Sequence, residues 1–332
     1  MRFKELLKNL LQIADFMERK GGVFFTYALR PEHSEHFALR KKSTLYPKCG
    51  IVIQGPVVTD RNFTLETAKI YRKIFPEATI VVSTWNDENP DVLNEFRKEN
   101  ITLVLSEKPE QGKPWGPNFN LQLVSSLAGV KMCRELNCEY VLKTRTDQRI
   151  YRPDAMRFFY CLTEEFPVAA DCKQKKRIIG VSLNTFKYRL YGLSDMTVFG
   201  STDDMLLFWG AELDYRDISA DHATTNRLFS ILNIGEVYLV TEFMKKINYD
   251  LQWTLKDSWN VFAEHFCVVD QQSIELYWHK YSRHDEYRHP KYYYATTGKE
   301  LSFSEWLEMH CNLQNLEINE NIPDLPHRER TE

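Results

Sequence analysis

Residues 50–56 have the sequence Gly-Ile-Val-Ile-Gln-Gly-Pro, an apolar run that stops at Gln54 and is closed by a glycine-proline turn. Glycine allows close backbone approach and proline fixes the chain direction, so we expect a strand over 51–54 to end here. From this stretch onward, short apolar runs alternate with segments of helical period. The strands predicted next are 79–83, 101–105 and 140–143, and the intervening helices are 64–75, 91–99 and 119–136. Strands that are apolar on both faces and alternate with helices favour a mostly parallel sheet with helices on both faces, the Rossmann-like α/β class.

The alternation weakens after residue 153, where loops and aromatic-rich stretches become common. Short strands are predicted at 178–183 and 237–240, and a short helix at 302–307. The predicted organisation has an N-terminal helical extension (1–45), a catalytic domain (46–290) and a C-terminal extension (291–332) whose end, 319–332, frays. Within the catalytic domain, 46–150 forms the nucleotide-binding half and 151–290 the acceptor half.

The overall composition excludes several classes of protein. The 332 residues carry 43 basic and 46 acidic side chains, a formal charge of −3, which lacks the basic footprint of a nucleic-acid-binding protein. No apolar run reaches the roughly 18 to 20 residues needed to span a bilayer, and charges interrupt the first twenty residues, so a cytoplasmic protein is expected. The seven cysteines are scattered without a C-x-x-C pair and are predicted to be reduced, mostly buried thiols.

The N-terminal segment has the 3.6-residue period of an amphipathic helix that stops at Gly21-Gly22. Residues 1–45 hold nine basic and five acidic groups, a net charge of +4 that leaves −7 for the rest of the chain. Two interpretations stay open. The basic helix lies on an anionic membrane surface through residues 1–20, or its apolar stripe packs on the main domain or on another subunit.

Ligands of open parallel sheets bind at the carboxyl ends of the strands, so the residues after each predicted strand are the candidates. The sequence contains no G-x-G-x-x-G and no P-loop motif. The second strand ends in Ser-Thr-Trp-Asn-Asp (83–87), which could hold a base and a ribose, or could place Trp85 in the core before a turn. Asn118 opens the long helix and is either its N-cap or a contact for an anionic ligand.

The most informative stretch follows the fourth strand, where Lys143-Thr-Arg-Thr-Asp-Gln-Arg149 concentrates charge at a strand end. Unpaired buried charge is costly, and a diphosphate or a metal ion carrying one would offset that cost. Arg145 can bind phosphate oxygens through two N–H groups, and Asp147 is a hard oxygen ligand for Mg²⁺ or Mn²⁺. The alternative is a purely structural ion pair between Arg145 and Asp147.

These motifs, in this order, resemble the WavE family of lipopolysaccharide-synthesis proteins, which look like glycosyltransferases of the GT-A type. The resemblance covers about residues 48–285 and rests on six segments: 50–56, 83–85, Asn118 with 126–129, 143–147, 194–195 and 199–200. It implies a nucleotide-sugar donor and a glycan or lipid-linked glycan acceptor on the bacterial surface, in lipopolysaccharide or capsule synthesis. The expected nucleotide-sugar-binding residues are Gln54, Gly55, Pro56, Thr84, Trp85, Asn118, Lys143 and Arg145.

In GT-A enzymes an Asp-x-Asp motif at this strand exit binds the metal and the ribose-diphosphate. Here the triplet is Arg145-Thr-Asp147, so only the second acid is present, and metal dependence is in doubt. The resemblance implies Asp147 as the metal ligand for Mg²⁺ or Mn²⁺, with a late histidine completing the site. His279 is the first candidate and His265 the second, although a histidine among aromatic residues is more often structural.

Transfer to a sugar hydroxyl also needs a carboxylate that removes a proton. Asp195 and Glu242 are the candidate catalytic bases, with a role in a turn or a helix cap as the alternative for each. Asp203-Asp204 has the pattern of a helix start, and the aromatic stretch 277–294 could cover a sugar or form packing with a mobile loop. Two other functions stay open: a sugar nucleotidyltransferase, and a non-catalytic nucleotide- or glycan-binding partner in a synthesis complex.

Overall fold

A computed structural model describes residues 8–13, 16, 19–20, 30–40, 47–110, 118–217, 225–232, 235–280, 299–318 and 320. It divides the chain into two units, Met1–Glu32 and His33–Glu332. In the first unit the described residues up to Lys20 are helical, as the sequence predicts. The apolar side chains of Leu10, Ile13 and Phe16 are exposed there.

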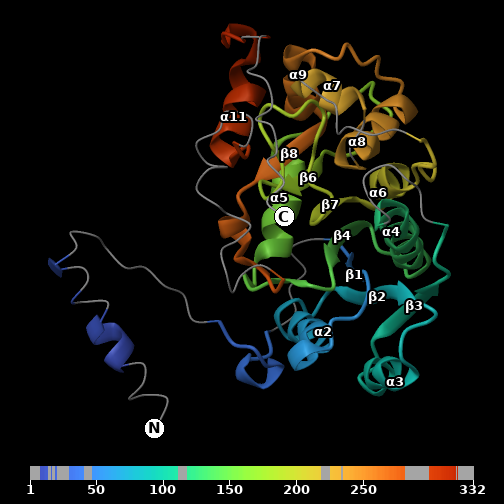
Figure 1. The fold of residues 1–332 in the computed structure, drawn as a ribbon, viewed down its shortest axis with the longest axis vertical. Helices are drawn as coiled ribbons and strands as arrows, with labels where there is room; N and C mark the ends of the chain where they lie inside the picture. The colour runs from blue at the N-terminus through green and yellow to red at the C-terminus, as the bar shows by residue number, and fades with distance from the viewer. Residues whose placement is uncertain are drawn as a thin grey trace. The chain divides into compact units, whose positions relative to one another are not determined.

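The second unit is built around a seven-stranded sheet with the order β3-β2-β1-β4-β7-β6-β8 (Figure 1). The strands are β1 (Cys49–Gln54), β2 (Thr79–Trp85), β3 (Thr102–Ser106), β4 (Tyr140–Arg145), β6 (Ile178–Val181), β7 (Val198–Ser201) and β8 (Phe266–Val269). Only β7 runs antiparallel to its two neighbours. A second, two-stranded antiparallel sheet pairs β5 (Gln148–Ile150) with β9 (Leu276–Trp278).

Helices connect the strands and cover them. They are α2 (Phe63–Ile74), α3 (Pro90–Lys98), α4 (Asn118–Glu135), α5 (Ala155–Glu165), α6 (Thr202–Trp209), α7 (Asn226–Ile231), α8 (Gly235–Lys246), α9 (Leu255–His265) and α11 (Phe303–Asn312). Short 3₁₀ helices are η1 (Ser34–His36), η2 (Asp60–Asn62), η3 (Gln271–Ile274) and η6 (Leu313–Asn315). Within the described part of the chain, no helix is both long enough and apolar enough to cross a bilayer.

Alternation along the strands places α4 and α2 on opposite faces of the sheet. On β1, a Cβ at Gly129 of α4 would lie 2.3 Å from Val52 Cγ1, so a glycine is needed for this helix to pack so close. On the other face, the Tyr71 hydroxyl of α2 is hydrogen-bonded to Thr144 of β4, which pairs with Ile53 of β1. Helices on both faces confirm the predicted α/β, Rossmann-like class.

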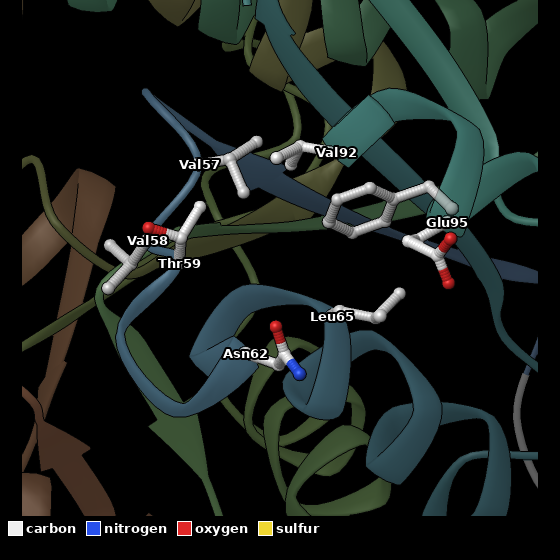
Figure 2. Close-up of a pocket in the computed structure, with 8 residues that line it drawn as sticks. Val57, Val58, Thr59, Asn62, Leu65, Val92 and Glu95 are labelled. Atoms are coloured by element: carbon white, nitrogen blue, oxygen red, sulfur yellow. The ribbon is translucent and has the colours of Figure 1, made fainter. Parts of the chain in front are cut away.

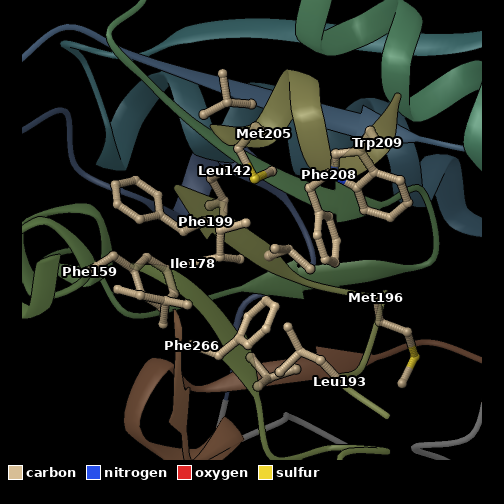
Figure 3. Packing of buried hydrophobic residues seen from close by; sticks show 14 of the residues in the cluster. Leu142, Phe159, Ile178, Leu193, Met196, Phe199, Met205, Phe208, Trp209 and Phe266 are labelled. Atoms are coloured by element: carbon tan, nitrogen blue, oxygen red, sulfur yellow. The ribbon is translucent and has the colours of Figure 1, made fainter. Parts of the chain in front are cut away.

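The core between β4, β6, β7 and α6 consists of large side chains that are fully or almost fully buried (Figure 3). Phe199 of β7 stacks on Phe159 of α5, with ring centroids 5.3 Å apart. Phe208 of α6 meets Phe266 of β8 at 6.3 Å. At about 1.5–3 kcal/mol for each fully buried large apolar side chain, this layer fixes the strands that carry the charged residues described below.

The predicted elements between 51 and 143 are confirmed with shifts of one or two residues, whereas one predicted strand is wrong. Residues 237–240 form part of helix α8. Their run Val-Tyr-Leu-Val is buried throughout, so its sequence shows no alternation, and a buried helix segment looks like a buried strand. Helices α5 and α9 were not predicted from the sequence. The helix predicted at 302–307 is α11, where Ser302 and Glu305 form a reciprocal capping box.

Two further predictions concern side chains. All seven cysteines are free thiols, and Cys49, Cys133, Cys138 and Cys267 are buried, as predicted. The helix start predicted at Asp203-Asp204 is α6, whose N-cap Ser201 accepts a hydrogen bond from Asp204 N.

The predicted fraying of 319–332 lies outside the described residues, apart from Glu320, which accepts from the first two amides of α9. The predicted division into two halves stays a prediction, because the sheet runs through both.

Candidate active site

The carboxyl end of β4 carries a bidentate ion pair. Arg145 Nε donates to Asp147 Oδ1 at 2.8 Å, and Arg145 Nη2 donates to Asp147 Oδ2 at 3.0 Å. The Trp278 indole N–H of β9 donates to the same Oδ2 at 3.0 Å. Burial acts to raise the pKa of Asp147, but the hydrogen bonds and charge of Arg145, with the indole, outweigh it and lower that pKa. The Arg145 side chain is 31% exposed, so the pair lies at the surface and is not enclosed in the interior.

The backbone around this pair is fixed by the end of β1. Thr146 N donates to Gln54 O at 2.9 Å, and Thr64 Oγ1 of α2 donates to Thr146 O at 3.0 Å. Gly55 has a φ of +123°, and a Cβ there would lie 3.0 Å from Thr146 Oγ1. Gly55 is therefore required both by its backbone conformation and by the close approach of the two strand ends.

His279 follows β9 directly and closes the other side of the strand exit. Its backbone N–H donates to Asp147 O at 2.9 Å. Its imidazole Nε2 lies 2.9 Å from Asp60 Oδ2 and its ring stacks on Phe63, with centroids 4.4 Å apart. The structure therefore brings the backbone of His279 beside Asp147, while its ring is directed to Asp60.

As arranged, these side chains do not fit a divalent cation. Both oxygens of Asp147 accept hydrogen bonds, and the imidazole of His279 is paired with Asp60. Among the residues that the structure describes, no three His, Cys, Asp or Glu side chains gather where they could hold a metal. The metal role of Asp147 and His279 stays a prediction.

A second charged group lies next to the first, around Lys143 of β4. This side chain is fully buried, its Nζ donates to Asp195 O at 2.7 Å, and it lies 4.6 Å from the ring centroid of Trp209. Burial lowers the pKa of Lys143 to about 7, against the attraction of Asp195. The amine therefore loses its proton far more readily than an exposed lysine does, and it has no surface exposed to a ligand.

The turn that carries Asp195 is bonded to the β4–β5 exit. Thr197 Oγ1 donates to Gln148 Oε1 at 3.0 Å, and Gln148 directly follows Asp147. Gln122 Nε2 of α4 also donates to Asp195 O, at 3.2 Å. Asp195 in turn raises the pKa of Glu236, in the first turn of α8, where burial is the larger cause. The two charged groups are therefore neighbours on one edge of the sheet.

Glu88 joins the ends of β1 and β2. Its Oε1 accepts a hydrogen bond from Thr84 Oγ1 at 2.9 Å and another from Val57 N at 2.8 Å. The Trp85 ring is 3% exposed and belongs to the core, which is the alternative that the sequence left open. Gln54 Nε2 donates to Ser125 Oγ at 2.8 Å, so its amide is tied to α4.

A small cavity of about 50 Å³ opens beside the segment that follows β1 (Figure 2). Val57, Leu65, Val92 and Phe96 give it apolar walls, and Asn62 and other polar residues stand at its rim. The Asn62 backbone has a φ of +53°, and its side chain caps nothing in α2. The cavity is too small for a nucleotide and leaves room only for part of a ligand.

Two other predicted residues, Glu242 and His265, are paired with partners outside these groups. Glu242 bonds Lys245 at 2.6 Å on α8, and His265 is buried with Nδ1 2.8 Å from Gln174 Oε1. Burial, with Arg177, lowers the pKa of His265 to about 4. Asn118 is the exposed first residue of α4, and Pro56 is exposed after Gly55.

Sequence reasoning missed four side chains of the site. Glu88 follows β2 by three residues and could have been found by extending the strand-end search. Trp278 was noted only as part of an aromatic stretch. Asp60 and Glu236 gave no signal, because Asp60 contacts a residue 219 positions away and Glu236 directly precedes the run that was predicted as a strand.

The fold and the site together define an α/β protein with adjacent charged groups at the carboxyl end of a central parallel strand. The family model described as WavE lipopolysaccharide synthesis matches residues 49–323. This match spans most of the chain, so the chain belongs to the WavE lipopolysaccharide-synthesis family.

Solved structures show only distant likeness. One is the mannosyltransferase PcManGT from Pyrobaculum calidifontis in complex with GDP-Man and Mn²⁺, at 12% identity and a TM-score of 0.32, covering 68% of this chain and 60% of that one. Another is a putative glucose-1-phosphate thymidylyltransferase from Bacillus anthracis in complex with a sucrose, at 10% identity and a TM-score of 0.30, covering 50% and 76%. No curated protein matches the sequence.

Proposed function

We propose that this protein is a GT-A-type glycosyltransferase that moves a sugar from a nucleotide-sugar donor to a bacterial surface glycan, in lipopolysaccharide or capsule synthesis. The observation that carries the proposal is the partly exposed Arg145–Asp147 pair at the end of β4. Membership of a lipopolysaccharide-synthesis family supports the acceptor class. Parallel sheets bind their ligands at this edge, and a guanidinium is suited to a diphosphate.

The proposed reaction breaks the bond between the anomeric carbon and the donor's phosphate oxygen. The electron pair leaves with the nucleoside diphosphate, and Arg145 stabilises the charge that develops there. An acceptor hydroxyl forms the new bond and loses its proton to a carboxylate. Asp147 holds the guanidinium in place, and Asp195 and Glu242 are the carboxylates that the sequence proposes for the proton. Thermal shifts measured with and without Mn²⁺ test whether a divalent metal also takes part.

The first prediction concerns ligand binding. In a thermal-shift panel of UDP, GDP and CDP, one nucleotide is expected to raise the unfolding temperature by several degrees. A ligand at 100 times its Kd adds about 2.7 kcal/mol to the free energy of unfolding. The matching nucleoside without phosphates is expected to give no shift, because the proposal places the recognition on the diphosphate. Repeating the panel with Mn²⁺ and with a chelator tests whether a metal is needed.

Turnover then separates the candidate functions. A glycosyltransferase releases nucleoside diphosphate from a nucleotide sugar, whereas a nucleotidyltransferase releases pyrophosphate from a nucleoside triphosphate and a sugar phosphate. Release of pyrophosphate alone would replace the proposal with the second activity. Binding without either product would favour a non-catalytic partner, and no binding to any nucleotide would remove the enzyme proposal.

The second prediction concerns the membrane. We propose that the net charge of +4 over residues 1–45 and the exposed Leu10, Ile13 and Phe16 bring the protein to the inner face of the membrane from the cytoplasm. The full chain is expected to sediment with phosphatidylglycerol vesicles and not with phosphatidylcholine vesicles. The double variant Ile13→Glu, Phe16→Glu is expected to remain in the supernatant. Equal sedimentation of wild type and variant would contradict this proposal.

A further inference from the structure

Two cysteines lie where α4 ends and the chain turns into β4, at the edge of the sheet opposite the candidate active site. The helix ends in a Schellman motif, in which Cys138 N donates to Cys133 O and Asn137 N donates to Arg134 O, both at 2.9 Å. Asn137 has the positive φ, +58°, that this motif requires. The residues at the two ends of the motif have their side chains in contact, and here both are cysteines.

Strand β1 packs against both sulfur atoms. A Cβ at Gly50 would lie 2.4 Å from Cys133 Sγ and 3.3 Å from Cys138 Sγ, so the two sulfurs lie against the same glycine. The Cys133 thiol donates a hydrogen bond to Cys138 Sγ. Two cysteines can be bridged only where their backbones are close and their side chains face each other. The hydrogen-bonded turn brings the backbones together, and the contact of both sulfurs with Gly50 shows that the side chains converge.

The neighbouring Cys49 does not share this arrangement. Alternation along β1 directs its side chain to the face opposite that of Gly50, and its Sγ donates to Pro47 O at 3.3 Å. In the part of the chain that the structure describes, no three Cys, His, Asp or Glu side chains are grouped where they could hold a metal. Cys133 and Cys138 are therefore a pair of thiols and not part of a larger ligand set.

The surroundings of Cys138 favour its thiolate form. The hydrogen bond from Cys133 lowers the pKa of Cys138, although burial acts to raise it. A hydrogen bond with Thr79 and the charge of Lys48 also lower this pKa. Lys48 is fixed at the turn, because its Nζ donates to Leu136 O at 2.6 Å. Cys138 is 4% exposed and Cys133 is fully buried, so Cys138 is the sulfur that a small reagent reaches first.

We propose that Cys133 and Cys138 form a redox-sensitive pair that a hydroperoxide converts reversibly to a disulfide. The Cys138 thiolate attacks a peroxide oxygen, the O–O bond breaks, and the departing oxygen takes up a proton, which leaves a sulfenic acid on Cys138. Cys133 Sγ then attacks Cys138 Sγ, the S–O bond breaks, and the hydroxide leaves as water with the Cys133 proton. Two thiols are oxidised by two electrons in total, and one peroxide is reduced. The proposal does not depend on the glycosyltransferase function proposed above.

The test uses the folded full chain, which is treated with hydrogen peroxide at neutral pH, alkylated and digested with trypsin without reduction. Cleavage after Lys131, Arg134 and Lys143 places the two cysteines on separate peptides, 132–134 and 135–143. Mass spectrometry is expected to find these two peptides joined, with the loss of two free thiols per chain. Treatment with dithiothreitol before digestion is expected to separate them again.

Single variants assign a role to each sulfur. Cys133→Ala is expected to stop at the sulfenic acid of Cys138, which dimedone labels, because the second thiol is missing. Cys138→Ala is expected to leave Cys133 reduced, because the reactive thiolate is missing. Cys267→Ala is the matched control, since Cys267 is a buried cysteine of β8 whose pKa is raised by burial. It is expected to leave the linkage between the two peptides unchanged.

The wild-type protein alone decides the proposal, whatever the variants do to folding. If both cysteines stay reduced at a peroxide concentration that oxidises the exposed Cys161, the pair is only core packing and the proposal is overturned. Linkage that forms in urea but not in the folded protein would overturn it too, because the native turn would then not supply the geometry. A disulfide between Cys138 and Cys49 would show that the pair has been assigned wrongly.

Discussion

Replacing Asp147 with asparagine is expected to slow sugar transfer by about 10²- to 10³-fold while the chain stays folded. Asparagine keeps the shape of the side chain and can still accept from the Trp278 indole. It loses the negative charge that pairs with the Arg145 guanidinium, and its amide N–H groups face the N–H donors of Arg145 and cannot accept from them. Arg145 would then no longer be held where the diphosphate is proposed to bind.

The chain contains a matched control for this variant. Arg152 Nε donates to Asp154 Oδ1 at 2.7 Å, in the same Arg-x-Asp spacing, but this pair is exposed at the start of α5. Asp154→Asn is expected to leave transfer unchanged. Product release measured for both variants, with circular dichroism to confirm folding, separates a site effect from a general one. Full activity in Asp147→Asn would remove the site assignment.

The same substitution has a stability consequence with a defined pH dependence. The pKa of Asp147 is lower in the folded protein, so its stabilising contribution is present above the ordinary carboxyl pKa and is lost as pH falls through the folded value. At neutral pH, Asp147→Asn is expected to lower the free energy of unfolding by about 1–3 kcal/mol. The difference between variant and wild type should shrink in acid.

The fold was predictable where periodicity was strong. The segments between 51 and 143 alternate between short apolar runs and segments with helical signals, and the structure follows that pattern. The run at 237–240 was not predictable by period, because all four of its residues are buried and a single helical turn is too short to show the polar face of α8. The length of the surrounding segment, twelve residues without a turn signal, was the available hint.

The site was predictable only where its parts are close in sequence. Arg145 and Asp147 are two residues apart, and their charge at the end of an apolar strand is unusual enough to be noticed. Trp278 contacts Asp147 across 131 positions, and Asp60 contacts His279 across 219 positions. No local sequence pattern encodes these contacts. Glu236 was hidden for another reason, since its raised pKa depends on burial and on Asp195, and neither is visible in a single sequence.

The buried position of Lys143 lowers the stability of the folded protein, because a charged amine is removed from water. Its amine is fully buried, and the carbonyl of Asp195 is its hydrogen-bond acceptor. The folded state binds a proton at Lys143 with a pKa of about 7, against 10.5 for the unfolded chain. Below pH 7 the full cost is present, and above about pH 10.5 it is absent, so stability rises with pH between these values by up to about 1.4 kcal/mol per pH unit.

Lys143→Met is therefore expected to raise the free energy of unfolding at pH 7 by about 3 kcal/mol. Removing the buried amine abolishes a cost of about 4 kcal/mol, and losing its hydrogen bond to Asp195 O takes back about 1 kcal/mol. The gain over wild type should shrink as pH rises from 7 to 9, in urea titrations of both proteins. Lys131→Met, at an exposed position of α4, is expected to show no such trend. A constant difference between Lys143→Met and wild type would mean that Lys143 stays charged. Slower transfer in a more stable Lys143→Met variant would show that the buried amine is kept because it holds the Asp195 turn.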